Sequence, residues 1–279
     1  MFKLDTGEAL DGAGGNIEMF VGPGKKDIGG HVLVGAGYGP DEGGSVRLIG
    51  GSGESNDRKD AGHGGSVDLI GGTAYGQRYY GTERQIHHDH GGPVTLLGGT
   101  SEYSVGGYIH IVSGKSLAAT KFGHKSGEIR IETNNSTKHG RSGGISLSTG
   151  TSIDGNSGEI RILTGTAKYG AGGNFVMHSG EGSRGTGGNI TLLAGTSTDH
   201  DSTGGSIDVI GGAGTNQMSY SGGNGGSALV KGGDSYGGRR ENTGGDVNIQ
   251  GGGAQAGVGG SLLLNSGKGR SSGFIGKDF

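Results

Sequence analysis

One short unit recurs along the whole chain and limits what the chain can fold into. Two small residues, usually glycines, precede a variable residue, an apolar–variable–apolar triplet and a glycine-rich exit, as in GGSVRLIGG from Gly43 and GGNITLLAG from Gly187. The first apolar residue of each copy is Phe2, Ile17, Val32, Val46, Val67, Val94, Ile109, Ile129, Ile145, Ile160, Phe175, Ile190, Ile207, Ala228, Val247 or Leu262. The underlying repeat is about 15 residues, and such a regular series dominates any reading of the fold.

The alternation of apolar and variable residues predicts a short β-strand in each copy. Glycine at both ends of the copy predicts tight corners, since glycine weakens a strand interior. Parallel stacking of the copies would place like residues on like. We therefore predict an all-β fold without helices: a parallel β-solenoid of about 16 short strands with a 15-residue repeat. Two strands per coil are favoured over one, with pairs such as Val46/Leu48 and Ile190/Leu192 forming a continuous thin core.

The chain is predicted to be a single repeat domain over residues 1–279. Longer steps between copies indicate inserted loops near residues 50–64, 72–91, 113–126, 211–225 and 232–244.

Composition excludes several classes of protein. With 73 glycines and 29% hydrophobic residues in 279, a thick core is not expected. Zero cysteines exclude disulfides and thiolate sites, and three prolines exclude collagen. A net charge of -3 gives no basic surface for nucleic acid. No apolar run is long enough to span a membrane, and no signal-peptide pattern opens the chain.

The GG-x-φ-x-φ pattern (φ is an aliphatic residue) resembles that of glycine-rich repeat proteins of algal and oomycete cell surfaces. The resemblance covers nearly the whole chain. It implies a structural role and an extracellular or surface-associated location, and it transfers no catalytic residue.

No group of residues predicts catalysis or a cofactor. Asp68 and Asp208, on the outward row of the strands, lie too many repeats apart to form the carboxylate pair of a glycosidase. The run His87-His88-Asp89-His90 carries metal-ligating types, but adjacent residues rarely converge on one ion, so a polar loop is predicted there. We expect a non-enzymatic protein without a metal or cofactor.

Two features of the loops are candidates for binding or modification. Tyrosine and arginine on loops are common in binding surfaces, and the candidates are Tyr75, Arg78, Tyr79, Tyr80, Tyr220 and Tyr236. Asn134-Asn135-Ser136-Thr137 holds two overlapping N-glycosylation sequons in a predicted turn, and Asn189-Ile190-Thr191 is a third sequon.

The residue after each apolar pair should point outward, yet it is often apolar. This predicts a partner surface, since a contiguous apolar stripe usually marks one. The predicted assembly face consists of Phe20, Ile49, Ile70, Leu97, Val112, Leu163, Leu193 and Ile210.

Both ends of the chain carry strand-like residues, which predicts end-to-end contacts through Phe2, Leu4, Phe274 and Ile275. The sequence thus predicts a self-assembling building block of an extracellular fibre or filament, with self as partner. The alternative is an adhesin-like or tail-fibre module that binds a carbohydrate, such as a surface polysaccharide, or a receptor through its tyrosine-rich loops.

Overall fold

Among the described residues, ten repeats are each joined to the preceding repeat by a backbone hydrogen bond between two glycines. The structure, a computed structural model, describes residues 2–10, 12–26, 28–55, 62–75, 90–117, 125–137, 140–217 and 222–268. The N–H of the glycine two residues before the first apolar residue donates to the carbonyl oxygen of a glycine at the exit of the preceding repeat. These bonds measure 2.7–2.9 Å and join Gly44 to Gly37, Gly65 to Gly51, Gly92 to Gly72, Gly107 to Gly99, Gly127 to Gly114, Gly188 to Gly180, Gly205 to Gly195, Gly226 to Gly212, Gly245 to Gly233 and Gly260 to Gly252.

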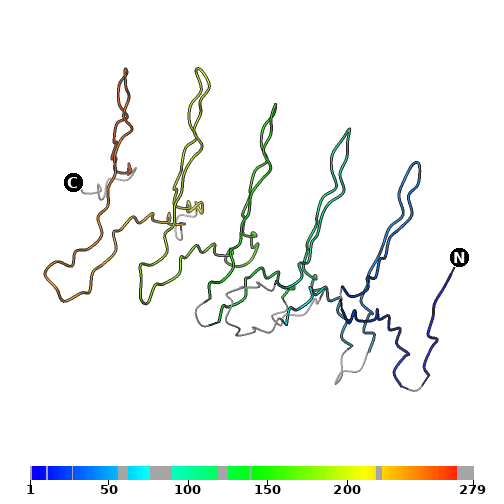
Figure 1. Cartoon of the computed structure of the whole chain (residues 1–279). Coiled ribbons are helices and arrows are strands. Elements are labelled where there is room, and N and C mark those ends of the chain that lie inside the picture. The colour runs from blue at the N-terminus through cyan, green and yellow to red at the C-terminus, as the bar shows by residue number, and fades with distance from the viewer. Residues whose placement is uncertain are drawn as a thin grey trace, which may run out of the picture. The chain divides into compact units, whose positions relative to one another are not determined.

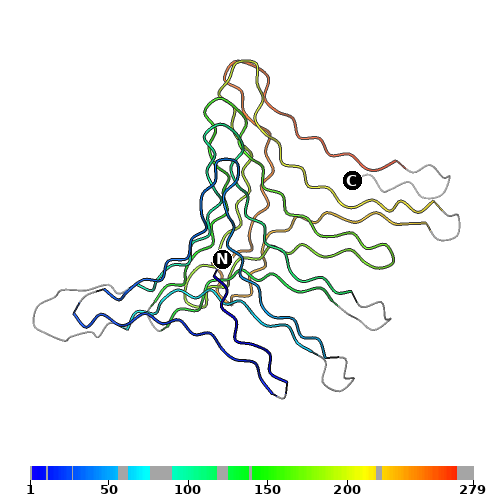
Figure 2. The ribbon, with the colours of Figure 1, turned by 90° about the vertical axis from the view of Figure 1, so that its right-hand side faces the viewer.

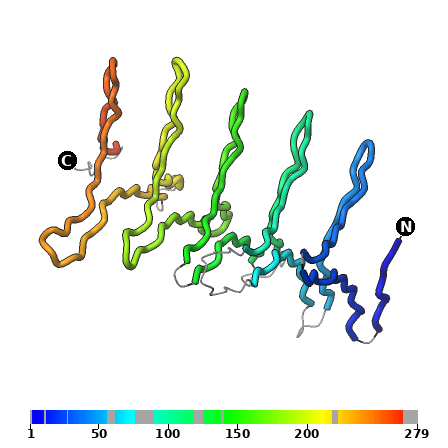
Figure 3. Tube along the Cα trace, viewed as in Figure 1, coloured from blue at the N-terminus to red at the C-terminus, as the bar shows by residue number. Residues whose placement is uncertain are grey.

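We call the donor the closing glycine and its bond the closing bond. The two chain segments that one closing bond joins, together with the turn between them, are called an arm. Figure 1 shows such segments running side by side, and Figure 3 traces the turn that joins them at the tip of an arm. The turns are local structures. In the arm between Gly195 and Gly205, the N–H of His200 donates to Asp199 Oδ1 at 2.9 Å, and Asp201 adopts a positive φ of 57°.

The chain forms two units, Met1–Ser146 and Leu147–Phe279. In each of them the backbone is extended between turns, as the side view in Figure 2 also shows. Near the start of the first unit, Gly7 has a φ of 79°, a conformation that favours glycine, and its N–H donates to Asp5 Oδ1 at 3.1 Å.

The prediction of a parallel β-solenoid is wrong, because the described residues contain neither a β-strand nor a helix. The physical reason lies in the closing bonds. A sheet needs a ladder of successive backbone hydrogen bonds between two segments. Within the described residues, each closing bond is a single bond, and no further backbone bonds continue it along the two segments. The predicted strands, the coil and the number of strands per coil are therefore not properties of this structure.

The predicted thin core is also absent, since no described residue is buried. Val46 and Leu48 are 52% and 68% exposed, and Ile190 and Leu192 are similar. The chain exposes 29836 Å² in all. A compact monomer of 27.6 kDa would expose about 11,000 Å² and a fully unfolded chain about 40,000 Å². The apolar pairs of the repeats thus remain largely in water.

Candidate functional site

The least exposed of the residues that the structure describes lie, with one exception, at the closing contacts. Directly before the glycine that accepts the closing bond stands a small residue, which we call the exit residue. Nearly all the half-buried residues are exit residues: Gly50, Gly71, Ser113, Ser179, Ala194, Gly232 and Gly251, with Gly39 as the exception. The closing contact, rather than the apolar pair, is therefore where the chain is packed most closely.

The exit residue faces the closing glycine of the next repeat. A Cβ placed on Gly188 would lie 3.0 Å from the Cβ of Ser179, and a Cβ on Gly44 would lie 3.2 Å from that of Ala36. Contacts this short are tighter than most, so a side chain on the closing glycine would displace its neighbour by a few tenths of an ångström. Every copy after the first has glycine there, at Gly15, Gly30, Gly44, Gly65, Gly92, Gly107, Gly127, Gly143, Gly158, Gly173, Gly188, Gly205, Gly226, Gly245 and Gly260.

Two kinds of exit residue complete the contact in different ways. Where it is glycine, a Cβ would overlap the carbonyl oxygen of the closing glycine, as at Gly50, Gly71, Gly98, Gly211, Gly232 and Gly251. At three exit residues that carry a hydroxyl, that group donates to the carbonyl oxygen of the glycine two residues before the next apolar pair: Ser179 Oγ to Gly188 at 2.9 Å, Thr133 Oγ1 to Gly143 at 3.2 Å and Thr6 Oγ1 to Gly15 at 3.3 Å.

Sequence reasoning missed the exit residue, although a signal for it exists. The position four residues after the first apolar residue is occupied by a small residue in almost every copy, with Val21 as the largest. A column of small residues at a fixed place indicates close approach of two backbones.

The alternating residues of a repeat form a polar row that is held by local contacts. Arg130 Nε lies 3.7 Å from Glu128 Oε1 and 3.8 Å from Glu132 Oε2, and Arg161 Nε lies 3.3 Å from Glu159 Oε1. These side chains are exposed, so each pair contributes less than about 1 kcal/mol. Their main effect is to neutralise charge along the row.

The row continues in other repeats with uncharged or mixed contacts. Ser66 Oγ donates to Asp68 Oδ2 at 3.0 Å, and the rings of Tyr108 and His110 meet edge to face with centroids 6.4 Å apart. The Asp68 carboxylate thus accepts a hydrogen bond from a serine hydroxyl of its own repeat.

All eight residues of the predicted assembly face are described and exposed. Their exposed fractions run from 68% at Val112 to 87% at Phe20, Ile70 and Leu193. The loops of the chain leave these side chains uncovered. Their role in assembly stays a prediction.

The predicted end contacts are described only in part. Phe2 is 91% exposed and Leu4 is 61% exposed. Phe274 and Ile275 lie outside the described residues.

The candidate binding loops are likewise described in part. Tyr75 and Tyr236 are almost fully exposed, whereas Arg78, Tyr79, Tyr80 and Tyr220 lie outside the described residues. Lys231 Nζ lies 2.7 Å from Asp234 Oδ2, which also accepts a hydrogen bond of 3.5 Å from Tyr236 Oη. Tyr236 is therefore tied to a local ion pair.

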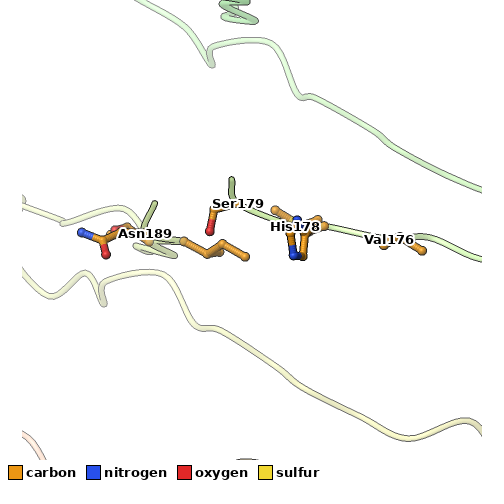
Figure 4. A pocket seen from close by; sticks show the side chains of 7 residues that line it. Val176, His178, Ser179 and Asn189 are labelled. Carbon is orange, nitrogen blue, oxygen red and sulfur yellow. The ribbon is translucent and has the colours of Figure 1, made fainter. Parts of the chain in front are cut away.

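A shallow recess of about 500 Å³ lies between the two segments of one arm, where Figure 4 shows Val176, His178 and Ser179 along one segment and Asn189 from the other. The remaining lining residues are Met177, Ile190 and Thr191. The lining offers an imidazole, hydroxyls and an amide but no carboxylate, so it lacks a paired acid and base.

A smaller recess of about 380 Å³ is lined by Glu132, Thr133, Asn134 and Asn135. Asn134 stands where every other repeat has glycine, directly after the exit residue.

Within the described ranges, no three His, Cys, Asp or Glu side chains gather around a point that could hold a metal ion. Of the run His87-His88-Asp89-His90, only His90 is described. The part of the chain that the structure describes also contains no apolar helix of membrane-spanning length.

No protein-family model, curated protein or solved structure matches this chain. The resemblance to algal and oomycete surface repeats therefore stays an expectation, and the case for a function rests on the geometry described above.

Proposed function

We propose that this chain is a structural building block of an extracellular fibre, in which its repeats pack against further copies of the same chain. The observation that carries the proposal is the exposed apolar pair of every repeat, with no buried residue among those described. Apolar surface of this extent is removed from water in stable proteins, and here no described part of the chain covers it.

A single copy gains little folding free energy from burial of its own apolar residues. Roughly half of most first apolar residues remains exposed, as at Val67 and Ile129, each 50% exposed, and Phe2 is exposed further. Complete burial of such a side chain is worth about 1.5–3 kcal/mol, so about 1 kcal/mol remains to be gained from a partner at each position. A repeated unit with so few apolar residues depends on neighbouring units to bury them.

A second copy is the partner that fits this surface. It carries apolar pairs in the same order and at the same separations along the chain, so contacts made at one repeat are repeated at the next. The polar row opposes such packing only weakly, because Arg130 offsets one of the two negative charges of Glu128 and Glu132 locally. A net charge of -3 over 279 residues adds little long-range repulsion between copies.

The proposed role is structural rather than catalytic. The recess between His178 and Asn189 lacks a carboxylate to pair with the imidazole, and the carboxylates of Asp68 and Asp5 are engaged in local contacts. Among the described residues these are features of a solvated surface rather than of a reaction centre.

The deciding experiment is sedimentation velocity of the purified chain over a wide range of concentration, combined with electron microscopy of negatively stained samples. We expect large assemblies with an elongated shape above a threshold concentration. A chain that remains monomeric at the highest concentration reached would contradict the proposal.

The loop around Tyr236 favours a second candidate function, the binding of a surface polysaccharide. Its exposed ring and its tie to Asp234 and Lys231 provide a stacking surface beside polar groups. Retention of the parent chain on an immobilised acidic or neutral polysaccharide, with loss of retention in Tyr236→Ala and not in Tyr38→Ala, would favour this candidate. Tyr38 is equally exposed, in another arm, and serves as the matched control.

A further inference from the structure

The turn that follows Thr133 differs from the corresponding segment of every other repeat. Elsewhere the exit residue is followed by glycine, whereas here it is followed by Asn134 and Asn135. Both asparagines are exposed and line the recess of about 380 Å³. At the corresponding glycines of other repeats, such as Gly72 and Gly180, a Cβ would meet no atom within 4 Å, so this place has room for a side chain.

We propose that Asn135 is an acceptor site for an N-linked glycan. The residue begins the sequon Asn135-Ser136-Thr137, which overlaps the sequon Asn134-Asn135-Ser136. The proposal rests on the extracellular setting of the proposed function, since the modification occurs on chains that pass through a secretory compartment.

Local hydrogen bonds distinguish the two overlapping sequons. The backbone N–H of Asn135 donates to Asn134 Oδ1 at 2.8 Å, so the carboxamide oxygen of Asn134 is engaged and the orientation of that side chain is held. The hydroxyl of Ser136, on which the first sequon depends, donates to the Thr137 carbonyl oxygen at 3.3 Å. That oxygen also accepts the N–H of Gly140 at 3.0 Å. In the described part of the chain, the carboxamide of Asn135 and the hydroxyl of Thr137 have no such partner.

The position suits a bulky sugar that must not disturb packing between copies. Along the chain, Asn135 follows the exit residue Thr133 and stands outside the apolar pair of Ile129 and Ile131. The third sequon begins at Asn189, which lies between the closing Gly188 and the apolar Ile190. A glycan there would stand beside the contact in which Gly188 bonds Gly180 and Ser179. Asn189 is therefore expected to remain unmodified.

The reaction transfers an oligosaccharide from a lipid diphosphate carrier. The side-chain nitrogen of Asn135 forms a bond to the anomeric carbon of the sugar, the bond from that carbon to the diphosphate oxygen breaks, and the amide gives up one proton. The lipid diphosphate is the leaving group. No oxidation or reduction is involved.

The test is secretion of the full chain from a eukaryotic host with a host leader, followed by peptide N-glycosidase treatment in water labelled with heavy oxygen. The enzyme converts a glycosylated asparagine to aspartate that carries the label, which peptide mass spectrometry locates. We expect the label at position 135 in the parent, in Asn134→Gln and in Asn189→Gln. We expect complete loss of the label, and of the gel shift caused by the glycan, in Asn135→Gln and in Thr137→Ala.

An unlabelled position 135 in the secreted parent would overturn the proposal, as would a label that persists in Thr137→Ala. Assembly is measured on the same secreted protein, and its outcome is independent of the outcome of the glycan test. A labelled chain that stays monomeric contradicts the proposed function alone, and an assembling chain without the label contradicts this inference alone.

Discussion

Ser179 and Gly188 are joined by a hydrogen bond in which Ser179 Oγ donates to the Gly188 carbonyl oxygen at 2.9 Å. The next residue along, Gly180, accepts the N–H of Gly188 at the same distance. One glycine is thus held at both its donor and its acceptor by two consecutive residues. This arrangement fixes the register between neighbouring repeats without a sheet.

A first prediction concerns the exit residue Gly71. A Cβ at this position overlaps the carbonyl oxygen of Gly92, so Gly71→Ala should open the closing bond from Gly92 to Gly72. Loss of one exposed hydrogen bond, about 0.5–1.5 kcal/mol, should speed amide exchange at Gly92 about 2- to 10-fold. The control is Gly72→Ala, because a Cβ there meets no atom within 4 Å. Equal exchange in the two variants would contradict the close approach at Gly71.

A second prediction tests the apolar pair as an assembly contact. Leu192→Asp would bury an unpaired charge between copies, which costs several kcal/mol. Even a cost of about 1.4 kcal/mol raises the threshold concentration for assembly tenfold. Thr191→Asp introduces the same charge on the polar row and should change the threshold much less. Light scattering across a dilution series measures both, and a similar rise in the two variants would speak against the apolar face.

A third prediction concerns the acidic titration of Asp5. The side-chain hydrogen bond from Lys3, which lies 3.0 Å away, and then the backbone N–H of Gly7 hold the pKa of Asp5 below its usual range. Because the pKa is lower in the folded chain, the contact is present above the ordinary aspartate pKa and is lost as pH falls through the lowered value. Carboxyl carbon shifts followed by NMR should show this, and Lys3→Gln should raise the pKa of Asp5. An unchanged pKa in that variant would assign the shift to Gly7 instead.

A fourth prediction separates a building block from a receptor-binding module. Ten glycine and serine residues inserted after Asp199 double the loop between Gly195 and Gly205. Loop closure then costs about 0.6 kcal/mol more, so exchange at the Gly205 amide should rise about threefold. The assembly threshold should not change. If the insertion abolishes assembly, the loops rather than the repeats carry the contacts.

The repeat unit could be recognised from the sequence, through the alternation at Val46 and Leu48 and the glycine at Gly44, but the pairing of neighbouring repeats could not. Parallel stacking would place like residues on like, whereas Gly44 at the entry of one repeat bonds Gly37 at the exit of the preceding repeat. The prediction of strands failed because alternation describes which residues share a side of the backbone, and not whether a second segment forms a ladder beside it. At Gly44 the N–H bonds Gly37 and no ladder follows within the described residues.

The candidate sites show the same division. The eight residues of the predicted assembly face could be named from the sequence pattern. Whether they become buried depends on contacts with other copies of the chain, and the pattern of one chain holds no information about these contacts. The contact of Ser179 with Gly188 was missed because it links residues nine apart across a loop of variable length. Asn134 and Asn135 were recognised as a sequon, but only the hydrogen bond between them distinguishes their roles.

The closing bonds also determine how the chain responds to pulling. Gly233 and Gly245 are 12 residues apart and Gly37 and Gly44 are 7 apart, so breaking these bonds releases up to about 40 Å and 25 Å of backbone at roughly 3.5 Å per residue. Each release costs the breaking of a single exposed N–H···O bond. A fibre made of this chain would therefore lengthen under tension in small unequal steps, with each arm acting as a store of hidden length, and would recoil as the glycine amides bond again.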